Sequence, residues 1–295
     1  MSIWLGISIV TIVAIISIYI YFAFKMVYSL NHPQRFDFGI KADLPCEYKK
    51  FDISTHDGFK LKGIDYVPHK KQKGVILICH YLGGSKEAIL QFVESLIING
   101  YRIISFDFRN HGESDNDLGI RYSLKKDFDA FYNAVSKLKI DGPIGIMGFS
   151  MGATPALVAL DKYPQVKAAI VDSGPLLFVK EYFYYVLENK REKNPIIKFL
   201  FVFIYLHYVG FSRMSKSTIE VLRKIKGKPI MYIHGIKDNI IHLKNAEYAY
   251  ELTKSELCEF IKVENSRHLT NQFLMKGNYD EKILRFFNKH LCNEE

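Results

Sequence analysis

The chain has 295 residues, of which 48% are hydrophobic and 24% are charged, and it contains no long low-complexity tract. This composition supplies a full hydrophobic core and excludes an intrinsically disordered protein. The net charge of +9 is scattered along the chain, without the basic stripe and interleaved aromatic residues of a nucleic-acid surface, so we expect no nucleic-acid partner. The four cysteines lack CxxC spacing and indicate neither a zinc site nor a disulfide framework.

The first element is an apolar segment at residues 3–24, which contains no charged residue. As a helix it would span about 33 Å, enough to cross the hydrocarbon core of a bilayer. A signal peptide would begin with positive charge and end at a small-residue cleavage site, and a helix that packs one face on a protein core would be apolar along one stripe only. We therefore predict a transmembrane anchor over residues 1–25 and a linker over residues 26–44, with the lipid bilayer as a partner.

Positive residues follow this segment, among them Lys25, Arg35 and Lys41, and none precedes it. The positive-inside rule then predicts a single-pass protein of the cell membrane whose carboxyl-terminal domain lies in the cytoplasm. The basic balance has two interpretations, attraction to an anionic membrane surface or an ordinary solvated surface, and both stay open.

Residues 45–295 alternate strand and helix patterns. Two alternating runs at 47–54 and 59–67, with Asp57-Gly58 between them, predict a hairpin, and the apolar run 74–79 predicts a buried strand. Further strands are expected at 101–107, 144–148, 166–171, 229–234 and 258–263, and helices at 86–99, 124–138, 151–163, 244–252 and 279–290. A hairpin followed by repeated strand–helix units predicts a mostly parallel α/β sheet with helices on both faces.

The alternation is interrupted by an aromatic and apolar stretch at 176–213, with Pro195 between two helical halves. A second membrane span over 196–211 is an alternative, but Lys198 and His207 interrupt it. Apolar side chains here would suit a pocket for an acyl chain. The competing interpretation, a segment that packs on the sheet with a small core of its own, has equal weight.

The sequence GFSMG at 148–152 fits the pattern G-x-S-x-G. A predicted strand precedes it and a predicted helix follows it, as a nucleophile elbow requires. Such a turn is strained and lifts the serine hydroxyl into the site, and small residues on either side allow the chain to bend that tightly. We therefore predict that Ser150 is a nucleophile.

A serine hydroxyl needs a base, and the base needs a third group that orients it. Asp238 follows the strand 229–234, and His268 follows the strand 258–263, in the chain order Ser, Asp, His. Active-site residues gather at the carboxyl ends of parallel strands, so we predict Asp238 as the acid and His268 as the base. Asp172, after an earlier strand, is the rival acid, and we interpret it as structural.

An oxyanion needs two backbone N–H donors. One is predicted at Met151, where a helix begins. The second is expected from the glycine-rich loop at 80–84, with Leu82 as the first choice and Tyr81 as the alternative. This loop lacks the lysine of a phosphate-binding loop.

Together, these motifs resemble the α/β-hydrolase superfamily, and within it the bacterial esterase, monoacylglycerol-lipase and serine-aminopeptidase-like branch. The resemblance covers the chain from about residue 45 to its end and rests on HYLGG at 80–84, FDFRNHGES at 106–114, GFSMG at 148–152, HGIKD at 234–238 and SRH at 266–268. It implies an eight-stranded sheet, a helical cap at 176–213 inserted after the sixth strand, and a structural role for His111. Two departures are Tyr81, where the family usually has glycine, and Ser266-Arg267, where the family usually has small residues.

We therefore expect a serine hydrolase that cleaves carboxylic esters of acyl or other apolar substrates through an acyl-enzyme. The alternatives are an acyltransferase or peptidase that uses the same three residues, and an inactive membrane-bound scaffold. No metal-ligand spacing such as H-E-x-x-H occurs, and the chemistry needs no metal or cofactor. The sequence does not indicate the oligomeric state.

Overall fold

The protein is built on one eight-stranded sheet with the strand order β1-β2-β4-β3-β5-β6-β7-β8. The computed structural model describes residues 3–36, 39, 43–119, 121, 124–138, 140 and 142–292. β2 runs antiparallel to both of its neighbours, and the other adjacent pairs are parallel, which confirms the predicted mostly parallel sheet. The strands are β1 Cys46–Ser54, β2 Lys60–Pro68, β3 Gly74–Cys79, β4 Tyr101–Phe106, β5 Ile144–Phe149, β6 Val166–Asp172, β7 Ile230–Gly235 and β8 Cys258–Val263.

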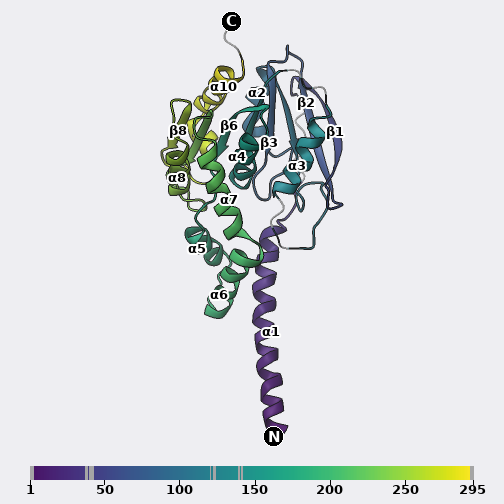
Figure 1. Cartoon of the computed structure of the whole chain (residues 1–295), viewed down its shortest axis with the longest axis vertical. Helices are drawn as coiled ribbons and strands as arrows, with labels where there is room; N and C mark the ends of the chain where they lie inside the picture. Colours follow the sequence, from purple (N-terminus) through teal and green to yellow (C-terminus); the bar gives the residue numbers. More distant parts are fainter. Residues whose placement is uncertain are drawn as a thin grey trace.

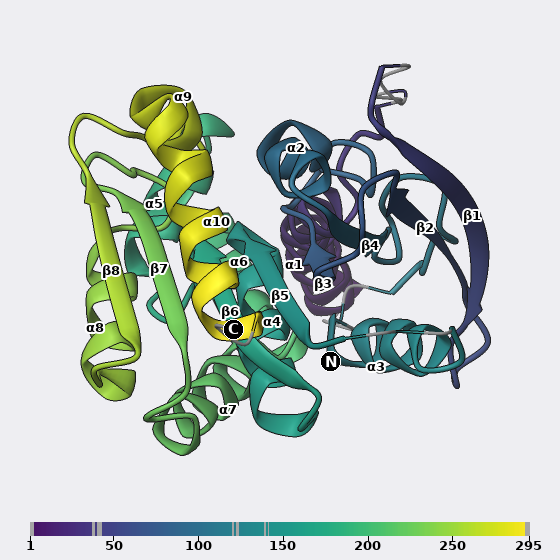
Figure 2. The same cartoon turned by 90° about the horizontal axis from the view of Figure 1, so that it is seen from above.

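Helices cover both faces of the sheet, as Figure 2 shows. Alternate residues of a strand point to opposite faces. In β3, Val75 and Leu77 join the core under α3, α4, α7 and α8, whereas Ile76 and Ile78 join the core under α2 and α10. The helices are α1 Ile3–Asn31, α2 Leu90–Ile98, α3 Leu124–Val135, α4 Ala153–Lys162, α5 Lys180–Asn189, α6 Pro195–Phe203, α7 Phe211–Lys224, α8 Lys244–Thr253, α9 Asn271–Met275 and α10 Gly277–Leu291.

The amino-terminal helix α1 projects from the body of the protein (Figure 1). Over Trp4–Asn31 it is long and apolar enough to cross a membrane. It continues to Asn31, so the first residues of the expected linker 26–44 are helical. The remainder of that stretch is described at 32–36, 39 and 43–44. The helix continues because residues near its end, including Ala23 and Val27, are buried against the cap.

The cap consists of α5, α6, a short π-helical turn at Ile204–Tyr208 and the beginning of α7. It has an aromatic core of its own, which includes Phe183, Phe201 and Tyr205, and it shares this core with the end of α1. Both sequence interpretations of the cap therefore have a structural counterpart, because its side chains form this core and several of them, such as Tyr205, also line the cavity described below.

The last cap helix, α7, extends beyond the expected end of the cap at about residue 213. α7 continues to Lys224, because Val221 and Leu222 pack into the core beneath α4 and α8. α6 and α7 are bent by 49° relative to each other around Gly210, which has a φ of +92°. Since Val221 and Leu222 pack over the sheet, α7 belongs to the body of the protein.

Candidate active site

Ser150 lies at the turn between β5 and α4, with a φ of +49°. A positive φ is unfavourable for a residue that carries a Cβ atom, so the surrounding structure must hold it. A single 3₁₀ turn at Ser150–Gly152 leads directly into α4. The predicted strand–turn–helix context of the motif is therefore present.

Two glycines allow this turn to close. A Cβ atom on Gly148 would overlap the backbone carbonyl of Gly152, and a Cβ atom on Gly152 would overlap the backbone carbonyl of Cys79 in β3. These contacts are with backbone atoms, which cannot rotate away. The G-x-S-x-G pattern is thus a steric requirement of the turn that presents Ser150.

The structure brings the three residues predicted as nucleophile, base and acid into one hydrogen-bonded row. Ser150 Oγ lies 2.8 Å from His268 Nε2, and His268 Nδ1 lies 2.7 Å from Asp238 Oδ2. The other carboxylate oxygen of Asp238 accepts hydrogen bonds of 2.9 Å from the backbone N–H groups of Ile240 and Ile241. Asp238 is buried and oriented by backbone donors, so it can fix the imidazole with Nδ1 protonated and Nε2 facing the serine.

The rival acid Asp172 is held in a separate network. Its carboxylate accepts hydrogen bonds from Tyr279 at 2.7 Å, Asn271 at 2.7 Å and Ser173 at 2.8 Å. Burial raises the pKa of Asp172 above its usual range. Ser173 Oγ in turn accepts the backbone N–H of Leu269 at 3.1 Å. Asp172 therefore supports the loop that carries His268.

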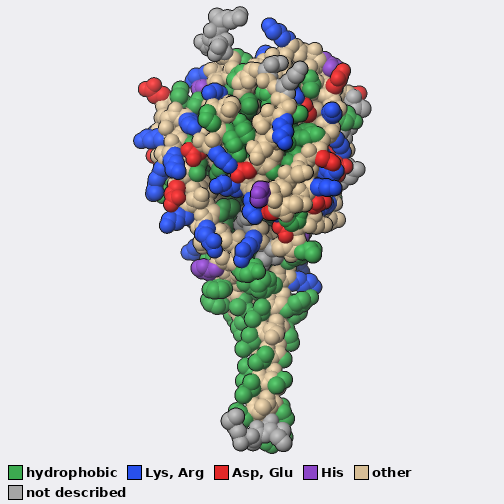
Figure 3. Space-filling model, turned by 45° about the vertical axis from the view of Figure 1, so that its right-hand side comes forward, with side chains coloured by type: hydrophobic (Ala, Val, Ile, Leu, Met, Phe, Trp, Pro, Cys, Tyr) green, Lys and Arg blue, Asp and Glu red, His purple; other side chains and the backbone are tan. Residues whose placement is uncertain are grey.

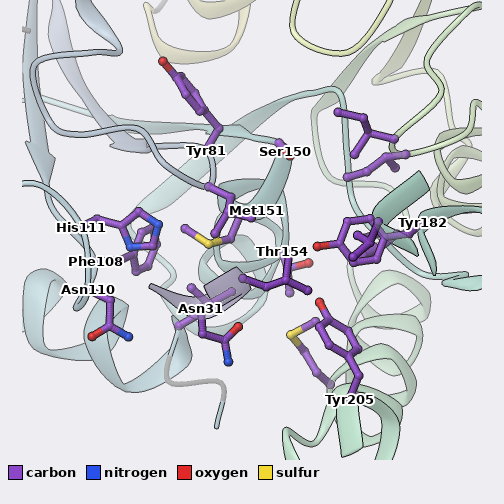
Figure 4. Close-up of a pocket in the computed structure, with 18 of the residues that line it drawn as sticks. Asn31, Tyr81, Phe108, Asn110, His111, Ser150, Met151, Thr154, Tyr182 and Tyr205 are labelled. Atoms are coloured by element: carbon purple, nitrogen blue, oxygen red, sulfur yellow. The ribbon is translucent and has the colours of Figure 1, made fainter. Parts of the chain in front are cut away.

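The predicted oxyanion donors surround the same cavity as Ser150. Met151, Tyr81 and Leu82 all line it. The loop forms a turn that is closed by the 2.9 Å hydrogen bond from Gly84 N–H to the Tyr81 carbonyl. Gly83 lies within this turn and has a positive φ of +79°. Figure 4 shows the Tyr81 side chain directed away from Ser150. Its ring packs edge-on against Phe92 at 6.2 Å, so the larger side chain found in place of glycine does not fill the site.

The model of the family "Serine aminopeptidase, S33" matches residues 70–206. A solved esterase structure from Pyrococcus furiosus superposes with a TM-score of 0.70 at 22% identity, covering 88% of this chain and 99% of that one. The chain therefore has the α/β-hydrolase fold.

Two curated relatives are similar to this chain over different lengths. The Bacillus subtilis protein YqkD is 26% identical over 247 residues, which cover 81% of this chain and 79% of that protein. A protein of Cyberlindnera fabianii named as a probable alcohol acetyltransferase is 31% identical over 149 residues, covering 44% of this chain and 39% of that one.

The cavity beside Ser150 has a volume of about 300 Å³ and lies between the sheet and the cap. Figure 4 shows Tyr182 and Tyr205 of the cap on one side and Phe108 and His111 on the other, with Ser150 between them. Asn31, at the end of α1, also lines the cavity together with the neighbouring Leu30. The amino-terminal helix therefore contributes to the wall of the site, and no sequence signal indicated this.

Two buried histidines hold the loops around the cavity. His80 Nε2 accepts the backbone N–H of Phe108 at 3.0 Å, so its Nδ1–H donates to the Tyr81 carbonyl at 2.7 Å. Burial lowers the pKa of His80 to about 4. Burial and the nearby His80 lower the pKa of His111 to about 3, and its Nδ1 lies 3.0 Å from the Arg109 carbonyl. Both imidazoles are neutral at pH 7, and His111 shapes its loop as expected.

An ion-pair network that the sequence did not reveal supports the same loops. Lys86 is fully buried, and its ammonium group lies 2.8 Å from Asp107 and 2.6 Å from Glu113. Burial alone would lower the pKa of Lys86, but these carboxylates raise it above its usual range. Asp107 also accepts the backbone N–H groups of Lys86 and Glu113. The network ties the chain after the oxyanion loop to the 107–113 turn.

Within the described part of the chain, no group of three or more His, Cys, Asp or Glu side chains is arranged to hold a metal ion. The four cysteines are free thiols.

Proposed function

We propose that this α/β hydrolase cleaves carboxylic esters with Ser150 as nucleophile, His268 as general base and Asp238 as the group that orients the base. The observation that carries the proposal is the hydrogen-bonded row from Asp238 through His268 to Ser150 Oγ, with distances of 2.7 and 2.8 Å. The strained turn at Ser150 supports it, because such strain is typical of functional sites.

The chemistry follows from this row. His268 Nε2 removes the proton of Ser150 while the hydroxyl oxygen attacks the ester carbonyl carbon. The backbone N–H groups of Met151 and Leu82, with Tyr81 as the alternative, stabilise the oxyanion. His268 then donates its proton to the departing alcohol, and an acyl-enzyme is left on Ser150. His268 next deprotonates a water molecule, whose attack releases the carboxylic acid and restores the serine.

An apolar acyl group is the substrate feature that the cavity favours. Phe108, Leu124, Leu176 and Val186 are among its lining residues, together with the rings of three cap tyrosines, Tyr182, Tyr185 and Tyr205. Burial of an alkyl chain against such a surface is favourable by about 0.8 kcal/mol for each CH₂ group.

The helix α1 supports a membrane location. It is apolar over a length that spans a bilayer, and a positive residue, Lys25, follows its most exposed part. We therefore propose a single-pass anchor with the hydrolase domain on the cytoplasmic side.

Acyl transfer is the second candidate, and the observation that favours it is the 31% identity to the probable alcohol acetyltransferase. In that reaction an alcohol would replace water in the second half of the cycle. Peptide cleavage on the same residues, suggested by the name of the matching family model, is a third. An inactive scaffold would show no turnover of any ester.

The test is turnover of a p-nitrophenyl ester series of increasing acyl length by the full-length protein in detergent. We expect hydrolysis by the wild type and its loss in Ser150→Ala, whereas Ser136→Ala, at an exposed serine, retains it. Added alcohol that appears in the product as a new ester would establish acyl transfer. Equal turnover by the wild type and Ser150→Ala would contradict the proposal.

A further inference from the structure

Apart from the partly buried Lys198, the helix α6 is apolar on its outer side as well as on its inner side. Phe201 is fully buried, yet Phe199 is 68% exposed, Phe203 is 53% exposed and Ile196 is also exposed. A helix that is apolar all round is normally buried in a core or placed in lipid. The outer side of α6 is therefore expected to contact another apolar surface, since large exposed apolar patches mark interaction sites.

The position of α6 beside α1 indicates that this surface is the lipid bilayer. Residues 4–22 of α1 are exposed, except for a partly buried Tyr19, and the tight contact with the cap begins at Ala23. At 1.5 Å per residue, the exposed part is about 28 Å long, close to the thickness of a hydrocarbon core. If that part fills the hydrocarbon core, then α6 meets α1 at the membrane surface.

The charged and aromatic side chains near the contact between α1 and α6 are also of the kinds found at a lipid interface. The exposed cations Lys25, Lys190, Arg191 and Lys193 lie at the end of α1 and between α5 and α6, and Lys190 donates to Ser29 of α1 at 3.0 Å. Exposed tyrosines accompany them at positions 21, 28, 184 and 208. Tyrosine and basic side chains are favoured at the boundary between acyl chains and anionic head groups.

The pattern is visible in Figure 3, where hydrophobic side chains cover α1 and continue onto the underside of the body, with Lys and Arg above them. Leu30 and Asn31, which line the cavity, come seven and eight residues after Ala23. One wall of the cavity therefore begins only about 10 Å along α1 from the expected edge of the hydrocarbon core.

We propose that the outer side of α6, formed by Ile196, Phe199 and Phe203, inserts into the surface of an anionic bilayer beside α1, and that the hydrolase takes its acyl ester substrate from that bilayer. The second part rests on the proposed function. The insertion makes α6 a second membrane contact, which fixes the orientation of the cavity relative to the lipid.

Fluorescence depth measurement tests the insertion without any enzyme activity. The chain has one tryptophan, Trp4, so Trp4→Phe combined with Phe199→Trp gives a single probe on α6. In vesicles of phosphatidylcholine and phosphatidylglycerol, we expect brominated acyl chains to quench this probe. The matched control is Trp4→Phe with Tyr48→Trp, at a site 54% exposed on β1, which we expect to stay unquenched. Equal quenching of the two probes would overturn the insertion.

Activity tests the second part. Phe199→Glu combined with Phe203→Glu is expected to lower the turnover of a long-chain ester embedded in these vesicles by about tenfold or more, because two carboxylates replace the apolar side chains that would enter the bilayer. Turnover of a soluble butyrate ester should be unchanged, and Tyr48→Glu should change neither. Equal losses on both substrates would contradict uptake from the bilayer. Absence of all turnover with a quenched α6 probe would instead reject the proposed function and leave the insertion standing.

Discussion

The two sides of the cavity are built in different ways. On the sheet side, Ser150, Asp238 and His268 each follow the end of a strand and are fixed by backbone contacts or buried hydrogen bonds. On the cap side, the wall consists of Tyr182, Tyr205 and the end of α1, which pack through apolar contacts in a separate core. The comparison suggests that the sheet side determines whether a reaction occurs, whereas the cap side determines which acyl group reaches it.

The largest effect should come from the hydrogen-bonded row itself. We expect His268→Gln and Asp238→Asn each to lower kcat by about 10⁴-fold, since the serine loses its oriented base. Steady-state kinetics with a soluble ester checks this, with exposed His56→Gln as the matched control. A loss of less than tenfold in either row variant would show that the sheet side does not determine the chemistry.

The next effect concerns the turn at Ser150. Gly152→Ala should lower the free energy of unfolding by about 1–3 kcal/mol, because the new Cβ atom meets the backbone of Cys79. Gly277→Ala is the matched control, since no atom lies within 4 Å of its added Cβ atom. Urea unfolding in detergent measures both, and equal stabilities of the two variants would mean that the turn is not sterically closed.

The buried histidines of the sheet side predict a pH dependence of stability. The pKa of His80 is about 4 in the folded protein and about 6.5 when unfolded, so the unfolded state binds more protons between these values. The free energy of unfolding should therefore fall as the pH is lowered from about 6.5 to about 4, by roughly 3 kcal/mol from His80 alone. Urea unfolding at several pH values measures the slope, and a flat profile over this range would contradict neutral, buried imidazoles.

The hydrogen bonds of Asp172 support the loop that carries His268. Removing one of them should change stability by an amount similar to or smaller than that caused by protonation of His80. Tyr279→Phe removes the donor to buried Asp172 and should cost about 1–3 kcal/mol of stability. Because Ser173 links this network to Leu269, kcat should also fall while the binding of soluble ester stays similar. Exposed Tyr184→Phe on α5 serves as the control. Unchanged kcat in Tyr279→Phe would mean that the network stabilises the fold without positioning the base.

The smallest effect should come from the cap side. Leu30→Trp enlarges the wall that α1 contributes and should lower the preferred acyl length in an ester series, with little change in kcat for the shortest esters. Exposed Leu118→Trp, away from the cavity wall, is the control. Equal losses for all acyl lengths would show that α1 affects the chemistry instead of the choice of substrate.

The same contrast explains what could be predicted from the sequence. The mostly parallel sheet could be predicted from the alternation of strand and helix patterns. The convergence of Ser150, Asp238 and His268 could be predicted because each follows a strand, and the carboxyl ends of parallel strands meet at one edge of the sheet. The network of Asp172 could not be predicted, since Asn271 and Tyr279 reach it only after α9 and α10 return over the sheet. The roles of the row and of the oxyanion donors stay predictions.

The cap side was less predictable for a physical reason. Apolar packing is not directional, so a run of aromatic residues does not specify its neighbours. The continuation of α1 to Asn31, its contact with the cap and the extension of α7 to Lys224 all depend on such packing. The expected linker and cap boundaries differ from the structure at these points.

Covalent labelling with a fluorophosphonate tests the central claim most directly, because the reagent forms a stable bond with an activated serine. Intact-protein and peptide mass spectrometry of the full-length protein should find one adduct, located on Ser150, and none in Ser150→Ala or His268→Gln. An adduct that persists in Ser150→Ala, or complete resistance of the wild type, would contradict the claim that Ser150 is the nucleophile.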